Sequence, residues 1–271
     1  MFERKELIAH DIQSVTNAQK AQILMNALPY IKRYSGKIVV VKYGGNAMVN
    51  EELKRTVMGD IVLLNLIGVK VVLVHGGGPH IKEILNRVGL ESKFLNGLRV
   101  TDAETMKIVQ MVLAGQVNKD LVNLIGSMGG NAIGLCGLDD QMIKVTKQSE
   151  ELGFVGKIAS VDVEIIKDNL DKGYIPVIST IGTDTKGQAY NINADTAAAE
   201  IAGALNAECM LSMTNIDGVL KDKDDPTSLI TDITVEQAEN LEKEGIIAGG
   251  MIPKVQCCTD AIQGGVKRVF I

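Results

Sequence analysis

KIVVVKYGG (37–45) and VKVVLVHGGG (69–78) are the two stretches that decide the fold of this chain. Each is an almost continuous apolar run that ends in glycines, and a helical pattern follows each, from about Glu51 and about Pro79. Apolar runs of this kind indicate strands covered on both faces, as in a parallel sheet with helices on either side. We therefore expect an α/β fold in which this strand–turn–helix design is repeated.

The middle of the chain continues the alternation. The capping-box spacing from Thr101 to Glu104 predicts the start of a long helix that runs to about Met128. NAIGLCGLD (131–139) and QMIKVTK (141–147) predict two short strands with hairpin turns. No linker rich in Pro, Gly or Ser interrupts this part of the sequence, so we expect any division into lobes to be a cleft within one architecture.

The last third repeats the same design. GYIPVIST (173–180) and AECMLSMTN (207–215) predict further buried strands. Between them, the alanine-rich stretch INADTAAAEIAGALN (192–206) predicts a helix that is entered through Asn193 and Asp195.

The first 35 residues differ from the rest, because they predict a helix with no strand beside it. Its apolar stripe recurs at helical spacing and comprises Ala21, Leu24, Leu28 and Ile31. The segment closes at YSG (34–36). Two interpretations remain open: the helix packs on its own subunit, or it contacts a partner subunit.

The composition excludes several classes of function. The chain has 271 residues, a formal net charge of −5, no Trp and 3% aromatic residues, which argues against a nucleic-acid partner. No run of 18 apolar residues is present, which argues against a membrane span. Cys136, Cys209, Cys257 and Cys258 lack metal-ligand spacing. We therefore expect reduced thiols and a cytoplasmic protein.

Two glycine turns, Gly44-Gly45 and Gly76-Gly77-Gly78, follow predicted strands and precede predicted helices. Glycine allows a ligand to approach the backbone closely, and a helix N-terminus presents free N–H groups to anions such as phosphate. Neither turn fits the GxxxxGK[ST] loop or the GxGxxG fingerprint. A tight turn with close helix–strand packing is the structural alternative for both.

Lys42 makes an anion site the favoured interpretation. It lies within the apolar run, two residues before a glycine turn, and a buried ammonium needs a counter-charge such as a bound anion. The alternative is a lysine whose stem lies on the sheet while its head reaches solvent. Lys254, close to the pair Gly249-Gly250, repeats the combination of glycines and a cation.

The absence of a recognisable general base narrows the chemistry. The sequence has three histidines and no HRD, DFG or GxSxG motif. A hydroxyl acceptor normally needs a base, whereas a carboxylate acceptor, with a pKa of about 4, is already ionised at neutral pH. Lysines and glycine turns without a base therefore favour phosphoryl transfer to a carboxylate, in which the protein supplies positioning and charge neutralisation.

Six segments carry a resemblance to a known family. They are VVVKYGGNAM, VVLVHGGGPHI, FLNGLRVTD, GQAYNINADTAAAEIA, TNIDGVL and GGMIPKV, in this order along the chain. Together they resemble the amino-acid kinase family, and within it the branch that phosphorylates the side-chain carboxylate of N-acetyl-L-glutamate in arginine biosynthesis. The resemblance implies a three-layer α/β/α sandwich around a mainly parallel open sheet, with an extra N-terminal helix. It also implies ATP as the phosphoryl donor, with Mg²⁺ held mainly by nucleotide phosphates.

The resemblance assigns roles to individual residues. Lys42 and Lys254 would neutralise the transferred phosphoryl group, and Asp195 would hold both lysines. Arg99 would bind the α-carboxylate of the substrate, and Asn191 its acetylated amino end. The amides of the turns would contact the phosphate and the attacking carboxylate, at Gly44, Gly45, Gly77 and Gly78. The nucleotide pocket would be lined by Thr214, Asn215, Asp217, Gly218, Val219, Leu220, Ile246, Ile247 and Ala248.

The resemblance also implies an organisation and an assembly. Residues 1–35 would be an oligomerisation helix, 36–185 an N-lobe for substrate binding and dimerisation, and 186–271 a C-lobe for the nucleotide. Family members with such a helix join homodimers into a hexamer, a trimer of dimers, and are inhibited by arginine. The family pattern continues beyond RVFI (268–271), so we expect its C-terminal end to be missing here, and part of the arginine site with it. Lys157 and Asn215 also depart from that pattern.

Three alternatives remain from the sequence. The first is a kinase of the same family that acts on glutamate, aspartate or a nucleotide. The second is a non-catalytic amino-acid sensor, or the kinase-like part of an acetylglutamate synthase, which would need neither lysine. The third is a Rossmann-type oxidoreductase, which the missing GxGxxG fingerprint disfavours.

Overall fold

A computed structural model describes residues 15–214, 218–222 and 225–271 of the chain. Asn215 and Asp217, two of the predicted nucleotide-binding residues, lie outside the described residues, as do residues 1–14 of the predicted N-terminal helix. Among the described helices, none is long and apolar enough to cross a membrane.

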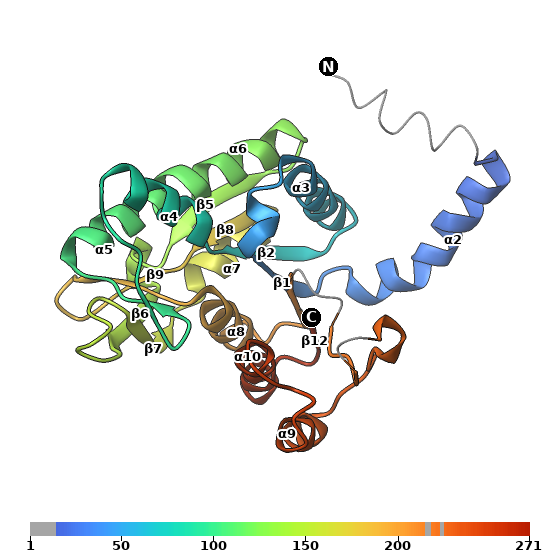
Figure 1. Cartoon of the computed structure of the whole chain (residues 1–271). Helices are drawn as coiled ribbons and strands as arrows, with labels where there is room; N and C mark the ends of the chain where they lie inside the picture. Colours follow the sequence, from blue (N-terminus) through green and yellow to red (C-terminus); the bar gives the residue numbers. More distant parts are fainter. Residues whose placement is uncertain (1–14, 215–217, 223–224) are drawn as a thin grey trace.

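A six-stranded sheet forms the centre of the molecule (Figure 1). Its strands, in spatial order, are β12 (Val269–Phe270), β11 (Cys209–Ser212), β1 (Ile38–Tyr43), β2 (Lys70–His75), β8 (Ile175–Ser179) and β5 (Ala132–Cys136). All five pairings between neighbours are parallel. The α/β fold with a mainly parallel sheet is thereby confirmed.

Helices cover both faces of this sheet. One face packs against α3 (Glu51–Leu66) and the long helical run that ends with α6 (Asn118–Ser127). The other face packs against α7 (Glu164–Asp171), α8 (Ala194–Ala204) and α10 (Met251–Gln263) (Figure 1). Successive residues of β1 alternate between these two cores, as the period of two in a strand requires.

A second sheet of four short strands lies beside the first. Its order is β10 (Ala189–Asn191), β9 (Ile181–Thr183), β6 (Ile143–Lys147) and β7 (Gly156–Val161). The strand pair expected at residues 131–147 does not form a hairpin. β5 instead pairs with β8 in the large sheet, and β6 pairs antiparallel with β7. Asp140 and Gln141, both with positive φ, redirect the chain between the two sheets.

The long helix expected from residue 101 to about 128 consists of three parts. α5 (Ala103–Gln110) continues into a π-helical segment, η2 (Met111–Val117), and then into α6. The expected cap at Thr101 is wrong, because Asp102 accepts the N–H of Thr105 at 2.8 Å. The hydroxyl of Thr101 instead donates to the carbonyl of Arg99.

The remaining described elements lie near the carboxyl edge of the large sheet or belong to the C-terminal part of the chain. They comprise α4 (Gly78–Arg87), the hairpin of β3 (Phe94–Leu95) and β4 (Leu98–Arg99), α9 (Val235–Lys243), and the short 3₁₀ turns η1 (Gly45–Met48), η3 (Asp139–Gln141) and η4 (Pro226–Ser228).

The N-terminal helix α2 (Asn17–Tyr34) projects from the body of the molecule (Figure 1). A capping box between Thr16 and Gln19 begins it, and Gly36, with φ of +73°, follows its end. None of its residues is buried, and the apolar Leu24 is 70% exposed. Most of its apolar stripe is therefore exposed in the described residues, and only the C-terminal end of the helix contacts its own subunit, where Tyr34 packs in part against the core.

Candidate active site

The predicted site residues gather at the carboxyl edge of the central parallel sheet. In β1 and β2, Lys42 lies opposite Val74 and Tyr43 lies opposite His75, so the glycine turns that follow the two strands are neighbours. The N–H of Gly76 donates to the carbonyl of Tyr43 at 3.0 Å. This edge is where open α/β sheets usually bind their ligands.

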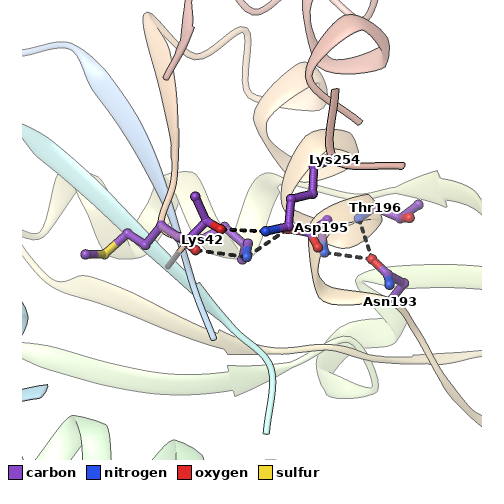
Figure 2. A network of polar contacts seen from close by, with 7 residues as sticks. Lys42, Asn193, Asp195, Thr196 and Lys254 are labelled. Carbon is purple, nitrogen blue, oxygen red and sulfur yellow. Dashed lines mark hydrogen bonds and ion pairs between the residues drawn. The ribbon is translucent and has the colours of Figure 1, made fainter. Parts of the chain in front are cut away.

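Lys42 is buried and carries a counter-charge from the protein itself. Its ammonium lies 2.8 Å from a carboxylate oxygen of Asp195 and donates to the carbonyl of Met213 at 3.1 Å (Figure 2). The residue is only 7% exposed, so its head does not reach freely into solvent. An ammonium in this position is stable only because a charged partner and a hydrogen bond replace its water.

The first turn of α8 places the carboxylate of Asp195. Asn193 is the N-cap residue, and its side-chain oxygen accepts the N–H groups of Asp195 at 2.9 Å and Thr196 at 3.1 Å (Figure 2). A negative charge in the first turn is also favoured by the helix dipole. The capping residue thus fixes the helix start, and the helix start presents Asp195 to Lys42.

Lys254 enters the site from the first turn of α10. Its ammonium donates to the hydroxyl of Thr214 at 2.5 Å (Figure 2). Because Lys42 donates to Met213 and Lys254 to the next residue, the two cations flank the same short stretch after β11. The resemblance implied that Asp195 would hold both lysines. Among the described contacts, Asp195 forms an ion pair with Lys42, whereas Thr214 holds Lys254.

A small cavity brings together three segments that are far apart in the sequence. Its volume is about 150 Å³. Its lining includes the second glycine turn, Arg99, Asn191 and Asn193. The side-chain amide of Asn191 donates to the hydroxyl of Thr101 at 3.2 Å, which orients it at the cavity wall.

Arg99 is the cation of this cavity. It is 8% exposed, and its guanidinium carbon lies 4.8 Å from the centre of the Phe94 ring. One nitrogen, Nη2, donates to the carbonyl of Gly78 at 3.1 Å, and Nη1 donates to the hydroxyl of Ser92. Burial lowers the pKa of Arg99, but an arginine remains charged at neutral pH. The cavity therefore has a fixed positive group suited to a carboxylate.

The glycine turns leave backbone donors free. Within the described part of the chain, no acceptor binds the N–H groups of Gly44, Gly45, Gly77 or Gly78. The last two begin α4, where the first-turn N–H groups point outward from the helix end. The arrangement is suited to an anion at this edge.

Gly77 also contacts the π-helical segment. A Cβ at this position would lie 2.5 Å from Cδ2 of Leu113 and 3.5 Å from Cγ2 of Val117. Leu113 lines the cavity as well. Segments of π-helix often occur at functional sites, and here the segment determines how closely a helix approaches the glycine turn.

Buried beside the turn is His75. Its pKa is lowered to about 4, mainly because burial disfavours the charged ring, and also because His80 and Lys119 add positive charge nearby. The ring is therefore neutral at pH 7 and is held by polar neighbours within the core.

The described part of the predicted nucleotide segment packs around a small apolar core. Val219 and Ile247 are buried there together with Ala238 and Val255, next to Lys254. Gly218 has φ of +127°, Leu220 and Ile246 are half-buried, and Ala248 is exposed. Gly218 and Val219 also line a larger cavity of about 580 Å³, which contains neither lysine of the site.

Several residues of the site were not foreseen from the sequence. Ser92, which accepts a hydrogen bond from Arg99, has no motif that would mark it. Phe94, whose ring lies against the guanidinium of Arg99, begins the FLNGLRVTD segment, but no role was assigned to it from the sequence. Asn118, buried near His75, had a detectable signal, because its spacing to Leu121 and Ile125 places a polar residue in an apolar helical stripe.

Comparison with known proteins identifies relatives that cover most of the chain. A family model described as the amino acid kinase family matches residues 37–271. The acetylglutamate kinase of Brachyspira hyodysenteriae is 52% identical over 262 residues, which cover 96% of this chain and 91% of that protein. The acetylglutamate kinase of Clostridioides difficile is 54% identical over 256 residues, which cover 94% and 90%.

Solved structures agree with the fold. The structure of smu.665 from Streptococcus mutans superimposes with a TM-score of 0.76 at 29% identity, covering 86% of this chain and 93% of that one. The Giardia carbamate kinase structure superimposes with a TM-score of 0.66 at 17% identity, covering 85% and 90%. The second likeness concerns the fold alone.

The contact between Gly77 and Leu113 predicts a coupling between these residues. Gly77→Ala should lower the free energy of unfolding by roughly 1–3 kcal/mol through overpacking. Combining it with Leu113→Ala should cost less than the sum of the two single changes, because the smaller side chain removes the overlap. Urea denaturation of the four proteins measures this, and strictly additive costs would contradict the contact.

Because His75 is buried, we expect the free energy of unfolding to decrease as the pH is lowered. The unfolded chain protonates this ring below its ordinary pKa of 6.5, whereas the folded chain does so only near pH 4, so the unfolded state binds more protons between these values. As pH falls through this window, the stability advantage of the parent over His75→Asn should shrink by about 3 kcal/mol. Urea denaturation of both proteins at several pH values measures it. An unchanged difference would show that His75 titrates normally.

Proposed function

We propose that this chain, which belongs to the amino acid kinase family, transfers the terminal phosphoryl group of ATP to the side-chain carboxylate of N-acetyl-L-glutamate. The relatives named acetylglutamate kinase, at 52% and 54% identity over most of the chain, support this activity. The product is N-acetylglutamyl 5-phosphate, and the reaction is the second step of arginine biosynthesis. The observation that carries the proposal is the pair of lysines, one of them buried against Asp195, beside a cavity that contains a buried arginine.

The reaction needs charge neutralisation more than proton transfer. A carboxylate oxygen of the substrate forms a bond to the terminal phosphorus while the bond from that phosphorus to the bridging oxygen of ADP breaks. The attacking group is already ionised at neutral pH, so no residue has to act as a base. Lys42 and Lys254 would neutralise the transferred group in the transition state, with Lys254 on the nucleotide side. Asp195 would position Lys42 rather than accept a proton.

The acceptor would occupy the cavity beside the second glycine turn. Arg99 would bind the α-carboxylate, because two of its nitrogens are already fixed by protein acceptors and a guanidinium has further N–H groups to offer. Asn191 would bind the acetylated amino end. The free amides of Gly44, Gly45, Gly77 and Gly78 would contact the phosphate and the attacking carboxylate.

The nucleotide would bind in the C-terminal part. Thr214, Asn215, Asp217, Gly218, Val219, Leu220, Ile246, Ile247 and Ala248 remain the proposed lining. Magnesium would accompany ATP, neutralising phosphate charge. The described residues contain no group of three or more His, Cys, Asp or Glu side chains able to hold a metal, and Asp195 is already paired with Lys42. Phosphate oxygens and water would therefore be its main ligands.

The lobes and the assembly follow from the same proposal. Residues 36–185 would form the N-lobe, for acceptor binding and dimerisation, and 186–271 the C-lobe, for the nucleotide. The exposed apolar residues of α2 support a role of this helix in joining homodimers into a hexamer. We also propose inhibition by arginine and a cytoplasmic location. The location fits the four cysteines, which are all free thiols.

The reaction is tested by trapping the acyl phosphate with hydroxylamine in the presence of ATP and magnesium. N-acetylglutamate should give product, whereas glutamate and aspartate should not. Lys42→Ala should lower kcat by roughly 10² or more, and Arg99→Ala should chiefly raise the KM for N-acetylglutamate. Lys70→Ala, which changes a surface lysine of the neighbouring strand, is the matched control. No product from any carboxylate would overturn the enzyme proposal in favour of a non-catalytic sensor.

The assembly is tested by sizing the full chain by light scattering. The parent should form a hexamer, and Leu24→Glu should reduce it to dimers by placing a charge in the exposed apolar stripe. Gln22→Glu, in the same helix, should leave the hexamer intact. A parent that elutes as a clean dimer would contradict the proposed role of α2, and unchanged activity on addition of arginine would contradict the proposed inhibition.

A further inference from the structure

A chain of polar contacts runs beneath the second glycine turn, through the apolar core between β2 and α6. His75 and Asn118 are 0% and 1% exposed. Nδ1 of His75 lies 2.8 Å from the carbonyl oxygen of Gly76, and Nε2 lies 3.1 Å from the side-chain nitrogen of Asn118. Lys119 extends the chain to the surface by donating to the side-chain oxygen of Asn118 at 3.1 Å.

These contacts determine which ring nitrogen of His75 carries the proton. A carbonyl oxygen only accepts hydrogen bonds, so Nδ1 must donate to Gly76. Asn118 presents its NH₂ group to Nε2, because Lys119 occupies its oxygen, while the carbonyls of Val177 and Leu135 accept from its nitrogen at 2.8 Å and 3.3 Å. Nε2 is therefore the acceptor. The neutral ring with its proton on Nδ1 satisfies both neighbours, which agrees with the lowered pKa of His75.

Holding the carbonyl of Gly76 also orients the next amide. In a trans peptide the C=O and the following N–H point in opposite directions. The hydrogen bond from His75 therefore directs the N–H of Gly77 away from the core. Gly77 begins α4 and lines the small cavity, and its N–H has no acceptor among the described residues. Without a side chain of its own, the Gly76–Gly77 peptide needs such an external constraint.

A glycine on a neighbouring strand provides an independent observation. Gly134 lies inside β5, where a glycine costs stability unless something must approach closely. A Cβ at this position would overlap the side-chain oxygen of Asn118 and the ammonium of Lys119. β5 is therefore shaped around this polar chain.

We propose that His75 and Asn118 are positioning residues that hold the Gly76–Gly77 peptide so that the N–H of Gly77 faces the group undergoing phosphoryl transfer. This inference rests on the function proposed above. An amide aligned in advance stabilises developing charge without reorganisation in the transition state, so its loss should lower kcat more than it raises KM. Lys119 would act one step further out, by keeping Asn118 in the orientation that selects the ring tautomer.

The kinetic experiment compares His75→Leu with His75→Asn in acyl phosphate formation. Leucine removes the donor to Gly76, whereas asparagine places an amide N–H near the position of Nδ1. We expect His75→Leu to lower kcat at least tenfold, with the KM for ATP within twofold of the parent, and His75→Asn to recover most of the loss. A folded His75→Leu with parental kcat, or a folded His75→Asn as impaired as the leucine variant, would overturn the proposal.

A second variant keeps the test decisive if His75→Leu does not fold. Gly134→Ala leaves His75 intact but displaces Asn118, and it should also lower kcat selectively. Gly126→Ala, at an exposed position of α6 with nothing within 4 Å, is the matched control and should keep the parental rate. A folded Gly134→Ala with the parental rate would count against the proposal.

A spectroscopic measurement separates this inference from the proposed function. In protein labelled with ¹⁵N-histidine, the parent should show His75 protonated on Nδ1 and unprotonated on Nε2 at pH 7, with the His75→Asn spectrum giving the assignment. Gly134→Ala should shift the population toward the other tautomer. The ring should be neutral in this measurement, because positive charge on its neighbours His80 and Lys119 disfavours an imidazolium. A ring protonated on Nε2 in the parent would overturn the inference, whereas a parent with this tautomer but no acyl phosphate would overturn only the proposed function.

Discussion

The ion pair between Lys42 and Asp195 joins the strands and helices that form the candidate active site. A lysine at the end of a buried strand would be costly if its charge had no partner, because the ammonium loses its water there. Asp195 supplies that partner from the first turn of α8, and Met213 supplies a carbonyl from the end of β11. Three elements that are distant in the sequence are thereby fixed to one another at the edge of the sheet. The position of Lys254, which reaches the residue after Met213, depends on the same arrangement.

At this edge of the sheet, strand geometry places the charged contacts and the neutral hydrogen bonds on opposite faces. Side chains of a strand alternate between its faces, so Lys42 and His75, one residue out of step in paired strands, lie on opposite sides of the sheet. Lys42 meets α8, where the charges gather. His75 meets α6 in the apolar core, where it contacts backbone and amide groups. The glycine turns between them are therefore supported by an ion pair on one side and by neutral hydrogen bonds on the other.

Much of this fold follows from local patterns in the sequence. Apolar runs ending in glycine predicted the strands beside the site, and the stretch entered through Asn193 predicted α8. The partners of strands could not be predicted, because pairing depends on tertiary contacts, and β5 joined the large sheet although β6 is its nearest neighbour in sequence. Thr101 and Asp102 both have side chains that can cap a helix, but Asp102 is the cap, whereas the hydroxyl of Thr101 contacts the carbonyl of Arg99. For the site, Lys42 stood out as a charge in an apolar run, whereas Ser92 became relevant only once the hairpin brought it to Arg99.

The number of residues in the π-helical segment η2 determines which face of α6 points toward the sheet. Each residue of an α-helix advances the side-chain direction by about 100°, and a π-helix takes more residues for each turn. The segment therefore changes the direction in which the side chains of α6 point, relative to an uninterrupted α-helix. Asn118 is the first residue after it. Removing or adding one residue between 111 and 117 would rotate the whole of α6 relative to the sheet, turning Asn118, Leu121 and Ile125 away from their partners together. The number of residues here is thus constrained as strictly as their identity, whereas the exposed surface of α6 tolerates changes of side chain alone.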